Sequence, residues 1–278
     1  MKACLNILPS ENHLEEPFRS LWAGRDPFVA VEALQGEVFR ELEARRTLRT
    51  EVGGQSYFVK IHRGVGWGEI IKNLLCLRLP VLGAANEWQA IHRLAQLGVD
   101  TMHGVAFGRR GRHPATQHSF IITEELKPTI SLEDFCRDWP GNPPPLPLKQ
   151  ALIRRVAEMA RKMHQGGVNH RDFYLCHFLL HLDPAPTPES LKLSLIDLHR
   201  AQIRTATPRR WRDKDLASLY FSALDIGLTR RDCWRFLRGY FDRPLRLVLR
   251  DEAECLQQLE SEARHLRQRY LRKFAEKA

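Results

Sequence analysis

A long apolar segment is missing from this sequence. Its most apolar stretch, IIKNLLCLRLPVLGAA at residues 70–85, is interrupted by Lys72, Arg78 and Pro80. A membrane-spanning helix needs about 20 mostly apolar residues, so we expect none in this chain. The opening segment, MKACLNILPSENHLEEPF, lacks the apolar core and the cleavage-like site of a signal peptide. These absences favour a protein of the cytoplasm.

Closely spaced cysteines are also absent. No C-x-x-C pair occurs, and the six cysteines lie far apart at Cys4, Cys76, Cys136, Cys176, Cys233 and Cys255. A disulfide framework or a structural zinc site needs closer spacing, so we expect reduced thiols. With 43% apolar and 27% charged residues, the 278-residue chain is typical of a folded protein with one large domain or two lobes.

Acidic residues are outnumbered by basic ones. Lys and Arg total 43 and Asp and Glu 33, which gives a net charge of +10. The segment from Arg209 to Ala278 holds 17 basic and 11 acidic side chains, so +6 of the charge lies there. Such a field attracts nucleic acids, anionic membranes, phosphorylated glycolipids or acidic proteins. No zinc-finger spacing or RRM-like aromatic motif accompanies it, so we predict no nucleic-acid partner. A solvated basic surface remains the simplest alternative.

The first half of the chain alternates between strand and helix patterns. Two β-type runs surround Gly53-Gly54 within residues 42–62, a glycine pair suited to a hairpin turn. Residues 83–99 follow a helical pattern in which Trp88, Ile91, Leu94 and Ala95 share a face and Gly98 is the stop. HGVAFGR and HSFIITEEL predict a second strand pair across a basic loop.

The second half is mainly helical. SLEDF predicts a short helix capped by Ser131, and WPGNPPPLP (139–147) predicts a surface linker. Residues 148–167 form a strong amphipathic pattern with Leu152, Val156, Met159, Ala160 and Met163 on one face. A strand in LKLSLIDLH follows, and everything after Pro208 has a helical pattern, with a last helix from about Leu245. The order predicts an α+β chain with a strand-rich first part and a helical second part.

Four residues with phosphoryl-transfer chemistry follow one another in a fixed order. Lys60 ends a strand, Glu87 lies early in the next helix, Asp172 lies in a loop after a long helix, and Asp197 ends a strand 25 residues later. Phosphoryl transfer needs a cation on the phosphates, an acid that holds it, a carboxylate for the acceptor hydroxyl and a carboxylate for Mg²⁺. Each residue alone has an ordinary structural explanation. The ordered set predicts a protein-kinase-like fold.

The loop VNHRDFYLCHFLLH at residues 168–181 sharpens this prediction. Its His170-Arg171-Asp172 matches the triplet that opens the catalytic loop of protein kinases, and Asp172 is the candidate catalytic base. Five residues later, His177 stands where that loop has a metal-binding Asn. His177 either packs against the loop or serves with Asp197 as a metal ligand, and a nitrogen ligand favours Mn²⁺ over Mg²⁺ more than an oxygen does.

Several longer segments resemble the lipopolysaccharide core heptose(I) kinases of Gram-negative bacteria, from about Glu16 to Tyr240. They include GEVFRELEARRTLR, YFVKIHRG, EIIKNLL, LPVLGAANEWQAI, SFIITEEL, TISLEDFC, NHRDFYLCHFLLHL, IDLHRAQ and PRRWRDKDLASLYFSALDIGLT. The resemblance implies a two-lobed kinase-like fold, with an antiparallel sheet and one helix in residues 1–126 and a helical lobe in 127–278. It also implies Mg²⁺-dependent use of ATP, and Lys60, Glu87, Glu124 and Leu126 are the candidate nucleotide-binding residues.

For the acceptor, the resemblance implies the 4-hydroxyl of the first inner-core heptose of a lipid A–core glycolipid. The reaction would take place on the cytoplasmic face of the inner membrane, with the enzyme bound peripherally to the anionic surface. A chain of net charge +10 suits such a polyanionic acceptor. Acyl carrier protein, which is acidic, is a further possible partner of the basic face.

The sequence departs from the protein-kinase pattern in three places. Only Gly36 precedes the first expected strand where kinases have a glycine-rich loop, DLH at 197–199 replaces D-F-G, and no A-P-E segment follows. A chain without an activation segment lacks the usual platform for a peptide substrate. These departures favour a small-molecule or glycolipid hydroxyl as acceptor.

Three alternatives remain open. Small-molecule kinases of the aminoglycoside or choline type share the H-x-D loop and a D-L-A helix such as Asp215-Leu216-Ala217. A basic, non-catalytic kinase-fold protein is a second alternative, although it would need none of the four chemical residues. A metal site from Cys176, His177 and His181 is the third, but in a strand Cys176 faces away from the two histidines. We assign no role to Trp211 or Trp234.

Overall fold

The computed structural model describes residues 11–64, 66–68, 83–113 and 115–275. Most of the apolar stretch at 70–85, the segment EIIKNLL, and Cys4 and Cys76 lie outside these residues. The chain divides into two compact units, which we name by their content. The sheet unit comprises Met1–His92 and Met102–Glu125, and the helical unit comprises Arg93–Thr101 and Leu126–Ala278.

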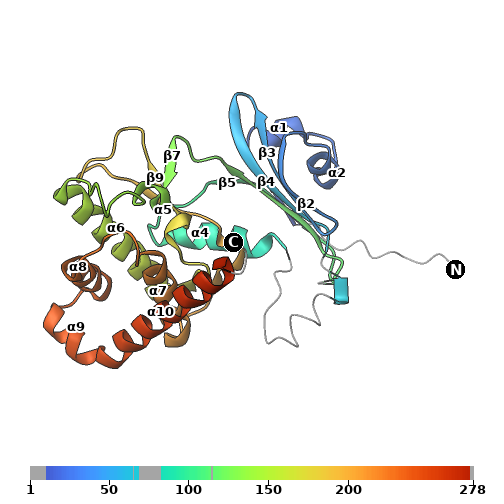
Figure 1. Cartoon of the computed structure of the whole chain (residues 1–278). Helices are drawn as coiled ribbons and strands as arrows, with labels where there is room; N and C mark the ends of the chain where they lie inside the picture. The colour runs from blue at the N-terminus through green and yellow to red at the C-terminus, as the bar shows by residue number, and fades with distance from the viewer. Residues whose placement is uncertain (1–10, 65, 69–82, 114, 276–278) are drawn as a thin grey trace. The chain divides into compact units, whose positions relative to one another are not determined.

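The sheet unit is built on one six-stranded sheet in which every pair of neighbours is antiparallel, in the order β1-β5-β6-β4-β3-β2 (Figure 1). The strands are β1 (Glu11–Leu14), β2 (Glu37–Leu42), β3 (Arg45–Val52), β4 (Gln55–His62), β5 (Gly104–Arg110) and β6 (His118–Glu124). The predicted hairpin at Gly53-Gly54 is confirmed, and both glycines have positive φ angles, 61° and 80°. Residues with a side chain rarely adopt such angles because of steric clashes, which explains why glycine occupies both positions of this turn.

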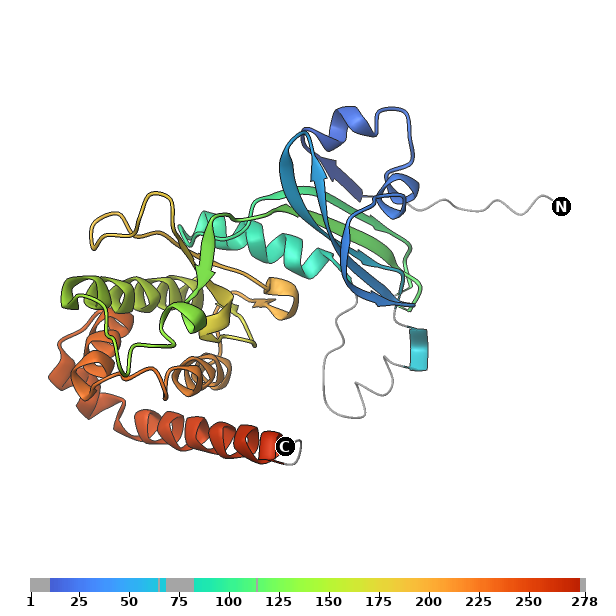
Figure 2. The ribbon, with the colours of Figure 1, turned by 45° about the horizontal axis from the view of Figure 1, so that its top comes forward.

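Two short helices that the sequence patterns did not predict cover this sheet. They are α1 (Phe18–Leu21) and α2 (Pro27–Glu32), and Figure 2 shows them beside the sheet. The Asp26 side chain caps α2 by accepting a hydrogen bond from the backbone of Phe28 at 2.9 Å. Phe18, Trp22 and Phe28 are buried in one cluster with sheet residues such as Phe120. These helices therefore supply much of the core of the sheet unit.

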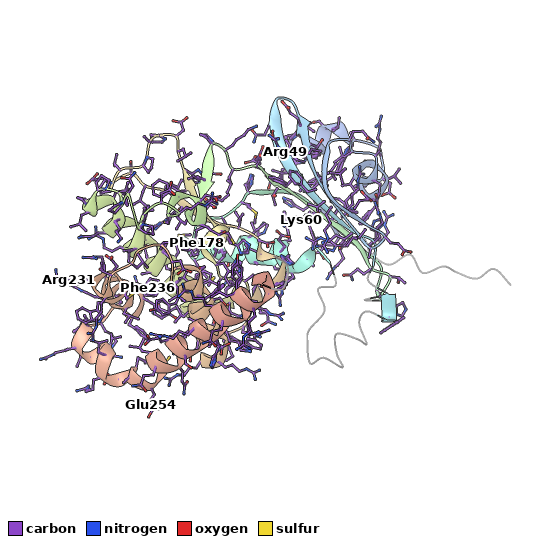
Figure 3. The ribbon with its side chains drawn as sticks, in the orientation of Figure 1. Arg49, Lys60, Phe178, Arg231, Phe236 and Glu254 are labelled. Carbon is purple, nitrogen blue, oxygen red and sulfur yellow. The ribbon has the colours of Figure 1, made fainter. Side chains whose placement is uncertain are left out.

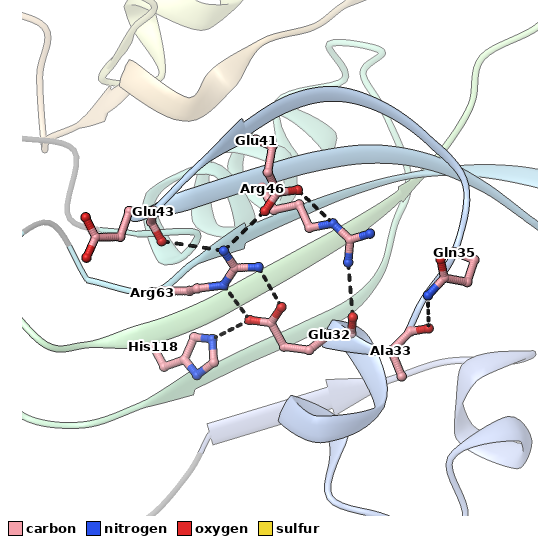
Figure 4. A network of polar contacts seen from close by, with 8 residues as sticks. All are labelled: Glu32, Ala33, Gln35, Glu41, Glu43, Arg46, Arg63 and His118. Carbon is pink, nitrogen blue, oxygen red and sulfur yellow. Dashed lines mark hydrogen bonds and ion pairs between the residues drawn. The ribbon is translucent and has the colours of Figure 1, made fainter.

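A network of charged side chains ties α2 to three strands of the sheet (Figure 4). Arg63 donates two hydrogen bonds of 2.8 Å to the carboxylate of Glu32, and a longer one to Glu41. Arg46 donates to the backbone carbonyl of Glu32 and pairs with Glu41. The Arg63 hydrogen bonds hold the pKa of the Glu32 carboxyl below its ordinary value. A two-pronged arginine–carboxylate contact is among the stronger ion pairs in proteins.

The predicted helix after the apolar stretch is α4 (Ala85–Gln96). Ala90, Ile91 and Leu94 are buried, but Ala95 is exposed, so its predicted place on the apolar face is wrong. The buried stripe runs from Glu87 to Leu94 with the spacing i, i+3, i+4, i+7, and Ala95, at i+8, lies at its edge in the last turn of the helix. Gly98 ends the segment with a φ of 64°.

The helical unit contains most of the helices of the described chain (Figure 1). They are α5 (Leu132–Phe135), α6 (Leu146–Gln165), α7 (Arg209–Ser222), α8 (Arg230–Phe241), α9 (Leu245–Asp251) and α10 (Ala253–Ala275). Ser131 caps α5 as predicted, and the predicted apolar face of α6 is buried throughout. None of the described helices is both long and apolar enough to cross a membrane.

Two sequence expectations in this unit need correction. Leu146 and Pro147 belong to the first turn of α6, so the linker predicted over 139–147 is too long. Proline is accepted there because the first backbone N–H groups of a helix have no partner within it. The last helix predicted from about Leu245 is in fact two helices, α9 and α10.

Short strands frame the loop that carries Asp172. β8 (Val168–Asn169) pairs with β11 (Gln202–Ile203), and β9 (Phe178–His181) lies between β7 (Thr129–Ser131) and β10 (Leu193–Leu195). Two single 3₁₀ turns, η1 (Leu175–His177) and η2 (Leu198–Arg200), complete the frame. Asp197 was predicted to end a strand, but β10 stops at Leu195 and Asp197 lies in a left-handed turn at φ 60°. The fold prediction, α+β with an antiparallel sheet followed by a helical part, is confirmed.

Candidate active site

Lys60 and Glu87 form an ion pair inside the sheet unit. Lys60, labelled in Figure 3, lies on β4 between Thr47 and Ile121 of the neighbouring strands. Its Nζ donates to Oε1 of Glu87, on the first turn of α4, at 2.7 Å. The Glu87 side chain is only 1% exposed, and its Oε2 has no hydrogen-bond partner among the described residues. A buried carboxylate is stable only when paired, so the pair holds the Lys60 ammonium in place.

The two other candidate nucleotide-binding residues lie at the end of β6. The backbone N–H of Glu124 donates to the carbonyl of His103 at 2.9 Å, and its carboxylate pairs with the same histidine. The carbonyl of Leu126 accepts a hydrogen bond from Oγ1 of Thr129. The turn at residues 43–44 that joins β2 and β3 contains no glycine, in agreement with the absence of a glycine-rich loop. A nucleotide-binding role for Glu124 and Leu126 stays a prediction.

In the helical unit, Asp215 of α7 anchors the loop that carries Asp172. Its carboxylate accepts hydrogen bonds from the backbone N–H groups of His170 at 2.6 Å and Arg171 at 2.8 Å. Asp215 is 1% exposed, and Nε2 of His164 lies 3.2 Å from it. Arg171 has a φ of 74°, a strained conformation that these bonds hold. The D-L-A segment at 215–217 gives no local sign of this role, because the role depends on a contact across 45 residues.

Asp172 is held by an arginine that the sequence analysis did not single out. Nη1 of Arg200, at the end of η2, donates to Oδ1 of Asp172 at 2.6 Å. No hydrogen bond to Oδ2 is present among the described residues, and the side chain is 17% exposed. One carboxylate oxygen is thus oriented, and the other is left to accept a proton or a hydrogen bond.

The hydrogen bonds of His170 assign its tautomer. A backbone carbonyl can only accept, so Nε2 carries the proton that it donates to Ile196 at 2.9 Å. Nδ1 is then free to accept from the backbone N–H of Asp172 at 3.3 Å. Burial lowers the pKa of His170, which favours this neutral form. The histidine of the triplet therefore supports the loop and does not face a substrate.

The same reasoning applies to His177. Its Nδ1 lies 2.6 Å from the backbone carbonyl of Asp172 and must donate to it. Nε2 then carries the lone pair of the neutral ring and lies 3.5 Å from Oδ2 of Asp197. Two electron-pair donors that face each other need a proton or a metal ion between them. Nδ1 of His199 lies 2.6 Å from the other oxygen of Asp197.

These donors fit a magnesium or manganese ion that takes its remaining ligands from water and phosphate. Mg²⁺ in kinases is bound by one or two protein side chains together with the substrate phosphates. No group of three or more His, Cys, Asp or Glu side chains able to hold a metal occurs in the described part of the chain. Asp197 and His177 thus suit an ion that arrives with a nucleotide, and do not form a closed structural site.

This result bears on the alternative metal site from Cys176, His177 and His181. Nε2 of His181 lies 2.9 Å from Oγ of Ser194 on β10, and His177 is directed to Asp172. Burial raises the pKa of the Cys176 thiol to about 11, so it is not a thiolate at neutral pH. The described residues give no support to this alternative.

The helical unit also contains an apolar cavity that the sequence did not predict. It has a volume of about 790 Å³, within the range of pockets that enclose drug-sized ligands. Residues of α5 to α10, of η1 and of the turn after α5 line it, among them Leu132, Trp139, Leu152, Leu175, Leu219, Trp234, Phe236, Leu249, Leu256 and Leu259. Phe236 is labelled in Figure 3. Trp234 and Trp139 thus belong to the wall of a cavity.

Comparison with known proteins places these features in a family. The profile of the lipopolysaccharide kinase (Kdo/WaaP) family matches residues 29–240. The chain is 66% identical over 256 residues to the lipopolysaccharide core heptose(I) kinase WaaP of Pseudomonas aeruginosa, which covers 92% of this chain and 96% of that one. It is 59% identical to the enzyme of the same name from Escherichia coli K12, over 94% of this chain and 98% of that one.

A solved structure agrees with these relatives. "WaaP in complex with acyl carrier protein" superimposes with a TM-score of 0.83 at 61% identity, and it covers 92% of this chain and 99% of that one. The predicted resemblance, the kinase-like fold and the class of enzyme, a phosphotransferase, are confirmed. The chain belongs to the lipopolysaccharide kinase (Kdo/WaaP) family.

Proposed function

We propose that this chain transfers the γ-phosphoryl group of ATP to the 4-hydroxyl of the first heptose in the inner core of lipopolysaccharide. The relatives named as heptose(I) kinases, 59–66% identical over most of their length, support this acceptor. The observation that carries the proposal is the carboxylate of Asp172, with one oxygen fixed by Arg200 and the other without a partner among the described residues.

In this proposal Asp172 is the catalytic residue. The free oxygen of its carboxylate accepts the hydrogen bond of the acceptor hydroxyl and takes its proton as the bond to phosphorus forms. Arg200 and the backbone bonds to Asp215 position the carboxylate, since they fix its oxygen and its loop. Positioning of this kind supplies much of the rate in phosphoryl transfer, where the protein does little covalent chemistry.

We also propose which residues hold the nucleotide and its metal ion. Residues 1–126 form the nucleotide lobe, with Lys60 on the phosphates and Glu124 and Leu126 beside the base, and residues 127–278 form the acceptor lobe. Asp197 and His177 would hold Mg²⁺ or Mn²⁺, which neutralises charge on the phosphates when bound. Glu87 keeps Lys60 in position through their 2.7 Å ion pair.

The alternatives fit the observations less well. An aminoglycoside- or choline-type kinase shares the loop, but the high identity to heptose(I) kinases extends over most of the chain. A non-catalytic binding protein has no need for a buried Lys60–Glu87 pair or for an oriented Asp172. Retention of both sets of contacts favours a working enzyme.

We further propose that the enzyme works in the cytoplasm, bound peripherally to the anionic face of the inner membrane. The net charge of +10 supports this. Acyl carrier protein is a second proposed partner, since one similar structure contains it. The apolar cavity of about 790 Å³ has the size and lining to accept an acyl chain that such a carrier bears.

Mass spectrometry of core oligosaccharide tests the proposed reaction. Cells with the protein should carry a phosphate on the first heptose, and cells without it should lack that phosphate until the wild-type gene is restored. Purified protein with labelled ATP and the unphosphorylated glycolipid should transfer the label to the same sugar. Transfer to an aminoglycoside or choline in place of the glycolipid would refute the proposal and favour the small-molecule alternative.

A further inference from the structure

Three arginines gather around the loop that carries Asp172. Arg171 precedes Asp172, Arg200 donates to its carboxylate, and Arg204 bridges β8 and β11 by donating to the side-chain oxygens of Asn169 and Gln202 at 2.6 Å each. We call Arg171, Arg200 and Arg204 the arginine cluster. It belongs wholly to the helical unit.

The arginine cluster carries more positive charge than its neighbours neutralise. Arg200 pairs with Asp172 through Nη1 alone, and Arg204 contacts neutral amides through both terminal nitrogens. The guanidinium of Arg171 has no hydrogen bond or ion pair among the described residues. Burial and the charges of Arg200 and Arg204 lower the pKa of Arg171, and the carboxylates of Asp172 and Asp215 raise it, so three positive charges lie near two negative ones.

The positive charge continues along the first turns of α7. The guanidinium of Arg204 lies 5.9 Å from the centre of the Trp211 ring, and Arg210 and Lys214 each place a cation 4.9 Å from it. Arg210 and Lys214 are exposed. Five cations therefore extend from Asp172 to the surface, and three of them lie around Trp211.

A purely structural role explains only part of this arrangement. Arg204 has one, since it joins β8 to β11, and Arg200 orients Asp172. Neither role needs Arg171, whose side chain is half-buried beside two like charges. The carboxylates of Asp172 and Asp215 offset only two of the three charges, and arginine offers paired N–H groups that match a further carboxylate or a phosphate.

We propose that the arginine cluster binds an anionic group of the acceptor, a carboxylate or a phosphate, next to the hydroxyl that receives the phosphoryl group. The inference rests on the proposed function and deepens it. Arg171 and the unpaired edge of Arg200 contact the anion, and Arg210 and Lys214 attract the acceptor from the surface. The anion thereby fixes the acceptor hydroxyl at Asp172, and an uncharged sugar is a poor acceptor.

The test compares acceptors with and without their anions. Initial rates are measured for wild type, Arg171→Gln, Arg171→Lys and the control Arg231→Gln. Arg231 is exposed on α8 and points outward in Figure 3. The acceptors are the intact glycolipid that lacks phosphate only on its first heptose, the same glycolipid with its sugar carboxylates reduced to alcohols, and the same glycolipid with its remaining phosphate esters removed.

We expect Arg171→Gln to raise KM for the intact glycolipid about 10- to 50-fold, the effect of one charge-assisted hydrogen bond, with KM for ATP unchanged. Arg171→Lys should recover part of the loss, and Arg231→Gln should equal wild type. On the acceptor that lacks the bound anion, wild type and Arg171→Gln should have the same KM. If the reduced acceptor behaves in this way, the bound anion is a carboxylate. If the acceptor without phosphate esters does, the bound anion is a phosphate.

Several results would overturn the inference. They are an unchanged KM for the intact glycolipid in Arg171→Gln, a change in KM for ATP alone, or an equal loss on all three acceptors. If Arg171→Gln does not fold, the exposed pair Arg210→Gln and Lys214→Gln takes its place, with an expected rise of about 3- to 10-fold. If wild-type enzyme transfers phosphate to none of the acceptors, the proposed function itself is refuted. If it is active but its KM for the acceptor does not depend on the arginine cluster, only the inference about the cluster is refuted.

Discussion

The ion pairs of the sheet unit differ from the charged groups around Asp172 in the helical unit. In the sheet unit, Glu87 is 1% exposed and permanently paired with Lys60, and Arg63 is matched by Glu32 and Glu41. In the helical unit, Asp172 is 17% exposed and Asp197 is 32% exposed. The Arg63 contacts join charges of opposite sign, and the Lys60–Glu87 pair leaves only Oε2 of Glu87 without a partner among the described residues. The helical unit leaves one oxygen of Asp172 and N–H groups of the arginine cluster without a partner among the described residues, as an enzyme must where its substrates change charge.

This difference has a physical consequence for how each unit responds to mutation. Removing one partner from a closed ion pair leaves a buried charge, so the damage is to folding. Removing a group that awaits a ligand leaves the fold nearly unchanged, so the damage is to catalysis or binding. The predictions below separate these two outcomes.

The largest effect is expected for Asp172. Asp172→Ala should lower the rate of phosphoryl transfer by about 10²- to 10⁴-fold through loss of the base, with ATP affinity and the unfolding midpoint close to wild type. Single-turnover transfer from labelled ATP and calorimetric titration of the nucleotide measure the two properties. Asp183→Ala, at an exposed turn, is the control. Near wild-type turnover in Asp172→Ala would remove Asp172 from the catalytic role.

The closed pair of the sheet unit should respond in stability. Lys60→Met leaves the Glu87 carboxylate buried without its cation and should lower the free energy of unfolding by about 3 kcal/mol or more. Glu87→Gln added to it should restore a large part of that loss, because the two residues act as one unit. Denaturant titration of both single variants and the double variant measures the coupling, with Arg40→Met on exposed β2 as control. Strict additivity would show that the pair contributes nothing.

For His177 we expect an intermediate effect on catalysis alone. His177→Ala should lower the rate about 10- to 100-fold, and His177→Asn should recover part of the loss with Mg²⁺, because an oxygen donor replaces nitrogen. Wild type should gain more from Mn²⁺ than His177→Asn does, because a nitrogen ligand suits Mn²⁺ better than it suits Mg²⁺. His265→Ala on exposed α10 is the control. Wild-type rates in His177→Ala throughout would mean that the ring merely packs.

The smallest effect concerns Glu32 and the acid stability of the sheet unit. Its pKa in the folded protein is lowered, mainly by the Arg63 hydrogen bonds, so its contribution is complete above the ordinary value of 4.5 and is lost as the pH falls through the lower folded value. Glu32→Gln should remove this contribution, about 0.5–1 kcal/mol for a partly exposed pair, at neutral pH. Unfolding free energies from pH 7 to pH 3 should converge for wild type and variant. A constant gap between the two curves would contradict the assignment.

Structural features that depend on residues close together in the chain were predicted from the sequence. The Gly53-Gly54 hairpin, the buried face of α6 and the cap at Ser131 depend on residues near one another in the chain, and all were predicted. The family was also predictable from the sequence, because each segment that carries the resemblance is contiguous.

Contacts between distant residues escaped prediction. Asp215 reaches back to the backbone of His170, and Arg200 reaches Asp172 from a different turn. The helices α1 and α2 are too short to show a periodicity, and the cavity arises from helices whose apolar faces each suggested a filled core. No single-residue signal distinguishes an apolar side chain at a cavity wall from one in a packed interior.

The left-handed backbone at Asp197 limits which residues that position can accept. Few side chains tolerate φ and ψ near 60° and 51°, and asparagine, aspartate and glycine are the main ones. In a saturation library of this codon, β-branched residues should reduce protein abundance as well as activity. Variants with asparagine or glycine at this position should keep their abundance and lose activity. These two variants therefore measure the contribution of the carboxylate without a change in the backbone of the turn.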